Sequence, residues 1–311
     1  MGAMFARKMS AGISLLHLAT IGLALICAGG EPASAQLGTF DKEKRIAITH
    51  KWTGERAEDG RPLVPDEVLR RLKTATAEEA WGVLRGDGYN YQFEANWQLV
   101  NPSTERMVGR VVTAQFMPIR PDMNEMINAK GAEEGRVSRG QNSWVIDTLQ
   151  PGDVLVVDMF GKIKDGTFAG DNLATAIYTK SKNGLIVNGS VRDVSGMQEI
   201  QGFRAFVKGV DPSAIKDVMM VGINVPIRIG ETTILPGDVV VSDPEGLTFI
   251  PPHLAEKVAD TSERIQLRDK WGHQMLRDGK YTPGQIDTRW TDTMNKEFEE
   301  WAAKERAKRQ N

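Results

Sequence analysis

The chain has 311 residues, of which 41% are hydrophobic, so it is long and apolar enough to bury a sizeable core. Its formal net charge is −2 at pH 7. This balance lacks the basic excess of a nucleic-acid-binding protein, and we expect no nucleic-acid partner. Its one cysteine, Cys27, lies near the N-terminus. A disulfide framework and a zinc site made of cysteines are therefore excluded.

Residues 1–35 have the composition of a secretory signal peptide. Arg7 and Lys8 precede an apolar run that ends before the small-x-small triplet at residues 33–35. Signal peptides carry a basic region, an apolar region and such a cleavage site in this order. The alternative is an N-terminal membrane anchor, but the apolar run is near the lower length limit for spanning a bilayer. We expect cleavage after Ala35, export to the periplasm and no membrane attachment afterwards.

Residues 36–64 are polar and glycine-rich, and we expect an irregular arm because few apolar positions recur in phase. Two short helices follow. Pro65 opens a pattern in which the apolar residues share one face. Thr76 begins the second helix, with Glu79 at the position of a capping box. The stretch at 86–101 has turn residues at both ends and is otherwise ambiguous.

Strand patterns dominate the middle of the chain. The segment 153–161 is a nearly continuous apolar run after a Pro-Gly turn, which suits a strand buried on both faces. A helix from Asp171 to about Lys182 and a second apolar strand at 185–191 complete a βαβ unit. Two strands connected in this way are parallel, with a right-handed crossover. Further strands are expected at 106–119, 203–210, 224–230 and 232–243.

Two helices are expected at the C-terminal end. A long amphipathic helix begins at Pro252 and runs to about Arg277, and a highly charged helix occupies 282–311. The apolar residues of the charged helix are spaced by 4, 4 and 3 positions, which places them on one stripe. We interpret the stripe as a packing face in preference to a partner-binding surface. Its members are Trp290, Met294, Phe298 and Trp301.

A possible anion site combines the helix start at Asp171 and Asn172 with the end of the following strand. The first turn of a helix offers unpaired N–H groups, and Arg192 follows the neighbouring parallel strand, where a ligand of an open α/β sheet binds. An Arg fork binds a carboxylate, and Asp193 adds a hard oxygen ligand suited to Mg²⁺ or Mn²⁺. The structural alternative is a helix cap at Asp171 and a surface ion pair between Arg192 and Asp193.

A family resemblance is carried by PGDVLVVD, GDNLATAIYTKSKNGLIVNGSVRD and PGDVVVSDPEGLTFIPPHLAEKV. These segments resemble the regulator of ribonuclease E activity A (RraA) family. That family includes class II 4-hydroxy-4-methyl-2-oxoglutarate aldolases, which also decarboxylate oxaloacetate. The aldolase members carry an Asp, twenty further residues and Arg-Asp, and here Asp171 is followed by twenty residues and Arg192-Asp193. The resemblance spans roughly residues 72–285.

The resemblance implies an α/β fold, a swivelling β/β/α layered domain with a central parallel βαβ unit. N-terminal helices and a C-terminal helical extension would be added to it. The expected domains are a signal peptide at 1–35, an arm at 36–64, an RraA-like catalytic domain at 65–281 and a charged helix at 282–311. Members of the family form trimers or pairs of trimers with sites near subunit contacts, so a homotrimer or hexamer is implied.

The resemblance also implies roles for the site residues. Asp193 would hold the metal, and Arg192 would bind the pyruvyl carboxylate and stabilise enolate charge. Asp171 would orient a metal-bound water for proton transfer. Residues at the helix start would bind the substrate together with Arg192, the last two through backbone N–H groups; they are Gly170, Asn172 and Leu173.

These roles describe a divalent-metal-dependent aldolase or decarboxylase that acts on small 2-oxo acids through a pyruvate enolate. The alternative is an exported, non-catalytic protein that binds a small carboxylate or a partner on the same scaffold. Export argues against inhibition of ribonuclease E, because that enzyme works inside the cell. Two further residues are interpreted without catalytic roles: Asp158 as a turn or capping residue in preference to a pocket residue, and His253 as a surface residue.

Overall fold

The structure is a computed structural model that describes residues 41–102, 105–136 and 140–309. All of these residues belong to one compact unit. The expected signal peptide at 1–35 lies outside the described residues, so its cleavage and the export of the chain stay predictions. Among the described residues, no helix is both long enough and apolar enough to cross a membrane.

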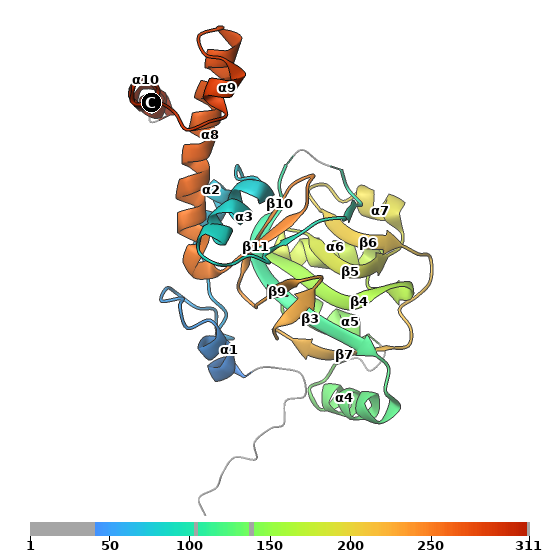
Figure 1. The fold of residues 1–311 in the computed structure, drawn as a ribbon. Helices are drawn as coiled ribbons and strands as arrows, with labels where there is room; N and C mark the ends of the chain where they lie inside the picture. The colour runs from blue at the N-terminus through green and yellow to red at the C-terminus, as the bar shows by residue number, and fades with distance from the viewer. Residues whose placement is uncertain (1–40, 103–104, 137–139, 310–311) are drawn as a thin grey trace, which may run out of the picture. The chain divides into compact units, whose positions relative to one another are not determined.

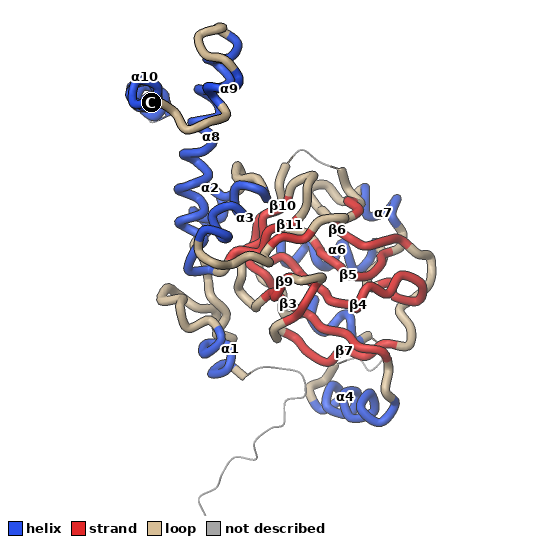
Figure 2. Tube along the Cα trace, viewed as in Figure 1, coloured by secondary structure: helices blue, strands red, loops and turns tan. Residues whose placement is uncertain are grey.

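Nine strands of the described chain form one mixed sheet (Figure 1, Figure 2). In spatial order eight of them are β1 (Phe93–Glu94), β11 (Leu247–Ile250), β10 (Val239–Ser242), β3 (Val108–Pro118), β4 (Asp153–Thr167), β5 (Leu185–Val191), β6 (Ala205–Val210) and β2 (Gln98–Leu99). The ninth, β7 (Val218–Ile223), pairs with β3. Strands β3 to β6 are parallel neighbours, and the other pairings are antiparallel.

The central sheet is covered on both faces, which explains why its strands read as continuous apolar runs. On one face, α5 (Gln141–Ile146) and α6 (Asp171–Ser181) contribute to a cluster with alternate residues such as Leu155. On the other face, Val154 packs in a cluster with a small hairpin. This hairpin consists of β8 (Ile227–Ile229) and β9 (Thr232–Ile234). The chain thus has β/β/α layers around the parallel β4–α6–β5 unit, as predicted.

Two Pro-Gly-Asp segments turn the chain into β4 and β10. Their glycines, Gly152 and Gly237, have φ angles of 86° and 88°, a backbone conformation that favours glycine. Each site is also crowded: a Cβ would lie 2.6 Å from Nη2 of Arg110 at Gly152 and 2.5 Å from Cδ of Pro62 at Gly237. The two turns therefore serve as close packing points as well as strand starts.

Three helices precede the sheet: α1 (Lys42–Ile48), α2 (Asp66–Leu72) and α3 (Ala77–Gly86). The predicted capping box is confirmed, because Thr76 accepts from the N–H of Glu79 and the Glu79 carboxylate accepts from the N–H of Thr76. The prediction of a fully irregular arm was wrong, because α1 lies within it. Asp41 caps α1 by accepting a hydrogen bond of 2.7 Å from the N–H of Lys44.

Buried basic side chains fix the arm to the domain. Nη1 of Arg61 lies 3.2 Å from Oδ1 of Asp153, with 4% and 3% of the two side chains exposed. Arg45 is also buried and donates to the carbonyl of Asn224 at 3.3 Å. The arm is therefore held by charged side chains that a search for apolar periodicity does not detect.

Several elements were not predicted. They are α4 (Pro121–Glu133), α5, α7 (Val194–Gln198), and strands β1, β2, β7 and β11. α7 has five residues and α5 has six, too short for a helical period to stand out. α4 is longer, but it buries Ile127 and Gly131 alone, so its apolar stripe is narrow.

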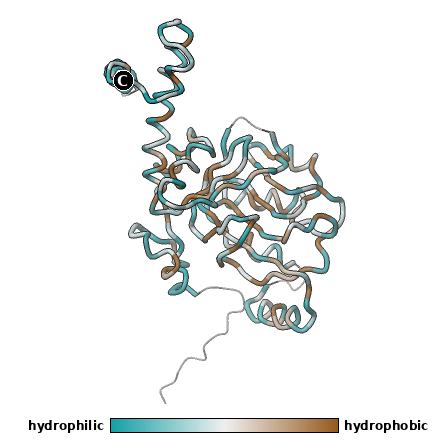
Figure 3. The backbone as a smooth tube through the Cα atoms, in the orientation of Figure 1, coloured by the Kyte–Doolittle hydropathy of each residue, from teal (hydrophilic) through white to brown (hydrophobic). Residues whose placement is uncertain are grey.

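The C-terminal part consists of a 3₁₀ turn at Pro252–Leu254, then α8 (Ala255–Arg277), α9 (Pro283–Ile286) and α10 (Asp292–Arg309). The prediction of a single helix at 282–311 was wrong, because residues 287–291 are not helical and separate α9 from α10. The packing interpretation of its stripe is confirmed: Trp290 and Phe298 contact Trp271 of α8, with ring centroids 4.7 and 6.0 Å away. Outside this aromatic cluster, α8, α9 and α10 are coloured mainly as hydrophilic in Figure 3.

Candidate active site

The predicted site residues meet where the loop before α6 runs beside the end of β5. Phe168 N–H donates to the carbonyl of Ser190 at 2.9 Å, and Arg192 N–H donates to the carbonyl of Ala169 at 3.1 Å. These bonds place the start of α6 next to the Arg192-Asp193 pair. The parallel βαβ connection therefore brings together residues that are about twenty positions apart in the sequence.

Gly170 lies where a side chain would collide with both charged residues of this site. It is the residue before the first turn of α6, and its backbone is extended, with φ −104° and ψ −170°. A Cβ at this position would lie 2.3 Å from Oδ2 of Asp193 and 3.3 Å from Nε of Arg192. The absence of a side chain thus allows both charged groups to approach the helix start.

Arg192 and Asp193 form an exposed ion pair beside Gly170. Nε of Arg192 lies 3.3 Å from Oδ2 of Asp193, and 42% and 48% of the two side chains are exposed. An ion pair this exposed contributes little to stability, so both groups can exchange partners with a ligand. Asp193 also has a left-handed backbone, with φ 54° and ψ 42°. Asp adopts this conformation more readily than most residues other than glycine, and here it turns the chain from β5 into α7.

Asp171 is held between α6 and α7. Its Oδ1 accepts a hydrogen bond of 2.7 Å from the N–H of Asn172. On the other side, a Cβ on Gly196 would lie 2.6 Å from Oδ2 of Asp171. Gly196 is therefore a site residue that sequence reasoning missed, because the short helix that carries it was not predicted. The signal available was a glycine four residues after Arg192.

The two backbone N–H groups expected to bind substrate at the start of α6 differ in whether they are free. The N–H of Asn172, expected to bind substrate, is already bonded to Asp171. No acceptor within the described part of the chain is bonded to the N–H of Leu173. The side chain of Leu173 is partly buried against the core, which fixes this backbone position. The N–H of Leu173 is therefore available to a ligand, whereas that of Asn172 depends on how Asp171 is placed.

The donor set fits a hydrated hard cation. Asp193 offers a carboxylate that is about half exposed, and no cluster of three or more His, Cys, Asp or Glu side chains suited to a metal occurs among the described residues. Mg²⁺ keeps several waters and is commonly held by one or two carboxylates, so it does not need a full protein cage. A structural zinc site, in contrast, needs four protein ligands.

Asp158 has the capping role predicted for it. Its Oδ1 accepts hydrogen bonds of 2.9 Å from the N–H of Phe160 and 2.8 Å from the side-chain amide of Asn188. Burial raises the pKa of this carboxyl above its usual value, and the bond from Asn188 lowers it in part. These two hydrogen bonds fix the bend of β4 after Asp158. They explain the residue by a structural role, and no catalytic role is needed.

Known proteins share this fold and these segments. A family model described as RraA-like, Aldolase/RraA, matches residues 84–249. A protein of Halalkalibacterium halodurans, named provisionally as a 4-hydroxy-4-methyl-2-oxoglutarate aldolase, is 32% identical over 164 residues, which are 51% of this chain and 77% of the relative. A Thermus thermophilus protein named 4-hydroxy-4-methyl-2-oxoglutarate aldolase is 31% identical over 108 residues, 34% of this chain and 64% of the relative.

A solved structure agrees with these matches. Streptomyces coelicolor RraAS2, described as an unusual member of the RNase ES inhibitor RraA protein family, has a TM-score of 0.58 and 25% identity. The match covers 69% of this chain and 99% of that protein. The segments that carry the candidate site lie within the matched residues 84–249, and this chain belongs to the RraA-like family.

Proposed function

We propose that the chain is a metal-dependent carbon–carbon lyase that releases pyruvate from small 2-oxo acids. The proposed reactions are retro-aldol cleavage of 4-hydroxy-4-methyl-2-oxoglutarate and decarboxylation of oxaloacetate. Aldolase-named relatives support this assignment. The observation that carries it is the convergence of Asp193 and Arg192 on the side-chain-free position of Gly170. This arrangement puts the guanidinium of Arg192, the carboxylate of Asp193 and the start of α6 within reach of one small acid.

Arg192 binds the carboxylate of the substrate in this proposal. Its guanidinium is half-exposed and is engaged by a single ion pair with Asp193 in the described structure, so a second carboxylate can approach it. An Arg fork holds a carboxylate in a fixed orientation. The positive end of the α6 dipole favours the same negative charge. Both features also stabilise the negative charge that develops when a pyruvate enolate forms, and a single such donor is typically worth about 3 kcal/mol.

Asp193 would hold Mg²⁺ or Mn²⁺, and a cation bound there would supply Lewis-acid stabilisation of charge on the 2-oxo acid. Asp171 handles the proton in this proposal. Its carboxylate is restrained by the N–H of Asn172 and by contact with Gly196, so it is held in one orientation at the start of α6. A restrained carboxylate can accept the hydroxyl proton of an aldol substrate directly or through one water.

We also propose that the protein is exported and that it forms oligomers. Export rests on the composition of residues 1–35, and oligomerisation rests on the resemblance to a family whose sites lie near subunit contacts. The exposed fractions of Arg192 and Asp193 support this arrangement, because a neighbouring subunit could cover the open side of the site. Size-exclusion chromatography with light scattering would measure the oligomeric state, and a monomer would contradict this part of the proposal.

The deciding experiment is pyruvate release from both substrates by the purified mature chain, with and without Mg²⁺. The Arg192→Ala variant should lose roughly 100-fold or more of the activity, in line with loss of one oxyanion donor. Arg120→Ala is the matched control, because Arg120 is an exposed arginine that pairs with a nearby Asp122 in the same way. Carboxylate binding without turnover would instead support the non-catalytic binding protein.

A further inference from the structure

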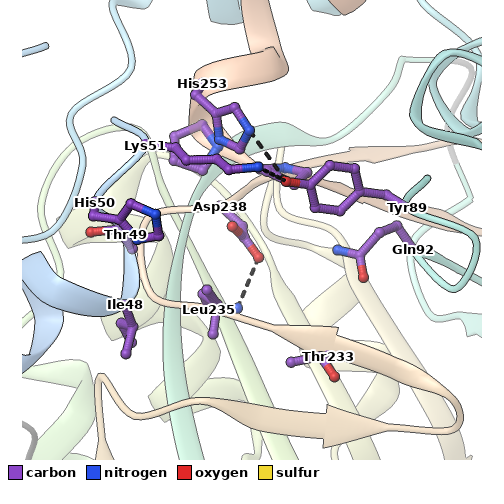
Figure 4. A pocket seen from close by; sticks show the side chains of 12 residues that line it. Ile48, Thr49, His50, Lys51, Tyr89, Gln92, Thr233, Leu235, Asp238 and His253 are labelled. Carbon is purple, nitrogen blue, oxygen red and sulfur yellow. Dashed lines mark hydrogen bonds between the residues drawn. The ribbon is translucent and has the colours of Figure 1, made fainter. Parts of the chain in front are cut away.

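A cavity of about 300 Å³ lies between the N-terminal arm and the second Pro-Gly-Asp turn (Figure 4). Ile48 and Lys51 line it from the arm, Leu235 and Asp238 from the turn, and His253 from the segment before α8. None of the residues of the candidate active site lines this cavity. Its volume is at the lower end of the range for small-molecule sites.

Asp238 lines the cavity and is almost completely buried. Its exposed fraction is 2%. Its Oδ2 accepts one hydrogen bond of 2.8 Å, from the N–H of Leu235. Within the described residues, no Lys, Arg or His side chain lies within salt-bridge distance of this carboxylate. A buried carboxylate without a cation is energetically unfavourable, and burial raises the pKa of Asp238 to about 8.

The first Pro-Gly-Asp turn shows what a completed arrangement looks like. Asp153 accepts a hydrogen bond from the N–H three residues earlier, Gln150, as Asp238 does from Leu235. Asp153 is equally buried, but Nη1 and Nη2 of Arg61 reach its two oxygens at 3.2 and 3.4 Å. The same motif therefore has a protein cation in one copy and faces a cavity in the other.

A second set of polar groups lines the same cavity. Nζ of Lys51 donates to the hydroxyl of Tyr89 at 3.4 Å, and Nε2 of His253 lies 3.3 Å from the same hydroxyl (Figure 4). Burial lowers the pKa of His253, and the nearby Lys51 and His50 lower it further. His253 was predicted to be a surface residue, but it is half-buried and bonded here. This set offers positive charge and hydrogen-bond donors to an anion.

We propose that the cavity binds a small zwitterion of amino-acid size. The ammonium group of the ligand would pair with Asp238, and its carboxylate would pair with Lys51 and the hydroxyl of Tyr89. Ile48 and Leu235 also line the cavity and offer apolar surface to the body of the ligand. Because the lining comes from both the arm and the domain, the ligand would also tie these two parts of the chain together.

The test is isothermal titration of the purified chain with 6-aminohexanoate, hexanoate and hexylamine. The zwitterion should bind most tightly, since it alone satisfies both polar sets. Asp238→Asn should weaken its binding by roughly 10- to 100-fold, which is the value of a hydrogen bond to a charged group. This variant keeps the shape of the side chain and an oxygen for the N–H of Leu235. Absence of binding by all three compounds would overturn the proposal.

Lys51→Met and Lys44→Met form a matched pair. Lys51 lines the cavity, whereas Lys44 is an exposed lysine of α1 that pairs with Asp41. Lys51→Met should remove the advantage of 6-aminohexanoate over hexylamine, and Lys44→Met should leave it unchanged. Equal effects of the two substitutions would show that the anion end of the ligand is not held at Lys51, which would contradict the proposed orientation.

Proton release separates a binding role of Asp238 from a structural one. The other titratable groups that line the cavity with Asp238 are His50 and Lys51 from the arm, Tyr89 after α3 and His253 before α8. Since Asp238 is largely protonated below pH 8, an ammonium ligand must displace its proton. Titrations at pH 7 in buffers of different ionisation enthalpy should show proton release by the unaltered chain and much less by Asp238→Asn. Equal release by both would overturn the assignment of the ammonium to Asp238.

Discussion

A Cβ on Gly170 would lie 2.3 Å from Oδ2 of Asp193, so the helix start and the metal-binding candidate share one small space. The φ angle of Gly170 is −104°, which any residue can adopt. Gly170→Ala should therefore fold normally while it pushes the flexible Asp193 carboxylate away from its position. We expect pyruvate release to fall by at least about tenfold, because a displacement of about 1 Å in a catalytic group has effects of that size or greater.

Gly82→Ala provides the control for this substitution. Gly82 lies in α3, and no atom lies within 4 Å of the position its Cβ would take. The helix should gain about 0.5–1 kcal/mol of stability from the change, and turnover should stay the same. If Gly170→Ala retained full turnover with an unchanged dependence on Mg²⁺, the contact between Gly170 and Asp193 would have no role in the reaction.

The sequence predicted the parts of this site that follow from regular structure. Asp171 begins a helix and Arg192 directly follows the next strand, and the parallel βαβ connection brings such positions together whatever the intervening residues are. Gly196 escaped prediction because its contact with Asp171 depends on α7, whose five residues carry no detectable period. The left-handed backbone of Asp193 also has no signature in the sequence.

The arm and its cavity were less predictable for a different reason. Sequence patterns detect apolar stripes, whereas the arm is anchored by buried charges such as Arg61 and Arg45. The partner of Arg61 is Asp153, which is 92 residues away, and no local pattern links them. The resemblance between the two Pro-Gly-Asp segments was visible, but the different fates of Asp153 and Asp238 depend on which part of the arm lies beside each.

The buried ion pair between Arg61 and Asp153 should contribute strongly to stability. Arg61→Ala leaves the Asp153 carboxylate buried without its cation, and breaking a buried pair in this way typically destabilises a protein by about 3–5 kcal/mol. Arg70→Ala is the control, since Arg70 forms an exposed pair with Glu67 that should contribute about 0–1 kcal/mol. Urea denaturation measures both values, and similar losses for the two variants would contradict the anchoring role of Arg61.

The aromatic cluster between α8 and α10 should control the attachment of the C-terminal helix. Trp271 is 2% exposed and contacts both Trp290 and Phe298. Trp271→Ala removes a buried aromatic side chain, a change that typically costs about 3–5 kcal/mol. Hydrogen exchange should then show faster exchange in α10 and little change in β4 and β5, which belong to other clusters. Unchanged exchange in α10 would show that other contacts hold this helix.

Asp238 should make stability fall as the pH rises from 4 to 8. An unfolded Asp has a pKa of 3.8, and burial raises the pKa of Asp238 to about 8 in the folded chain. The folded state therefore holds this proton more tightly. Its stabilising effect is complete below pH 3.8 and is lost progressively as the pH approaches 8. Relative to the unaltered chain, Asp238→Asn should gain up to about 1.4 kcal/mol per pH unit across this range, because its amide does not titrate.

Urea denaturation of both proteins at several pH values, without added ligand, measures this difference. His253, whose pKa is lowered by burial, is present in both proteins, so its contribution cancels in the comparison. Adding 6-aminohexanoate should reduce the difference at pH 8, because the ligand supplies the cation that the ionised carboxylate lacks. If the stabilities of the two proteins changed in parallel with pH, the pKa of Asp238 would be the same in the folded and unfolded chain, and burial would not hold its proton as argued above.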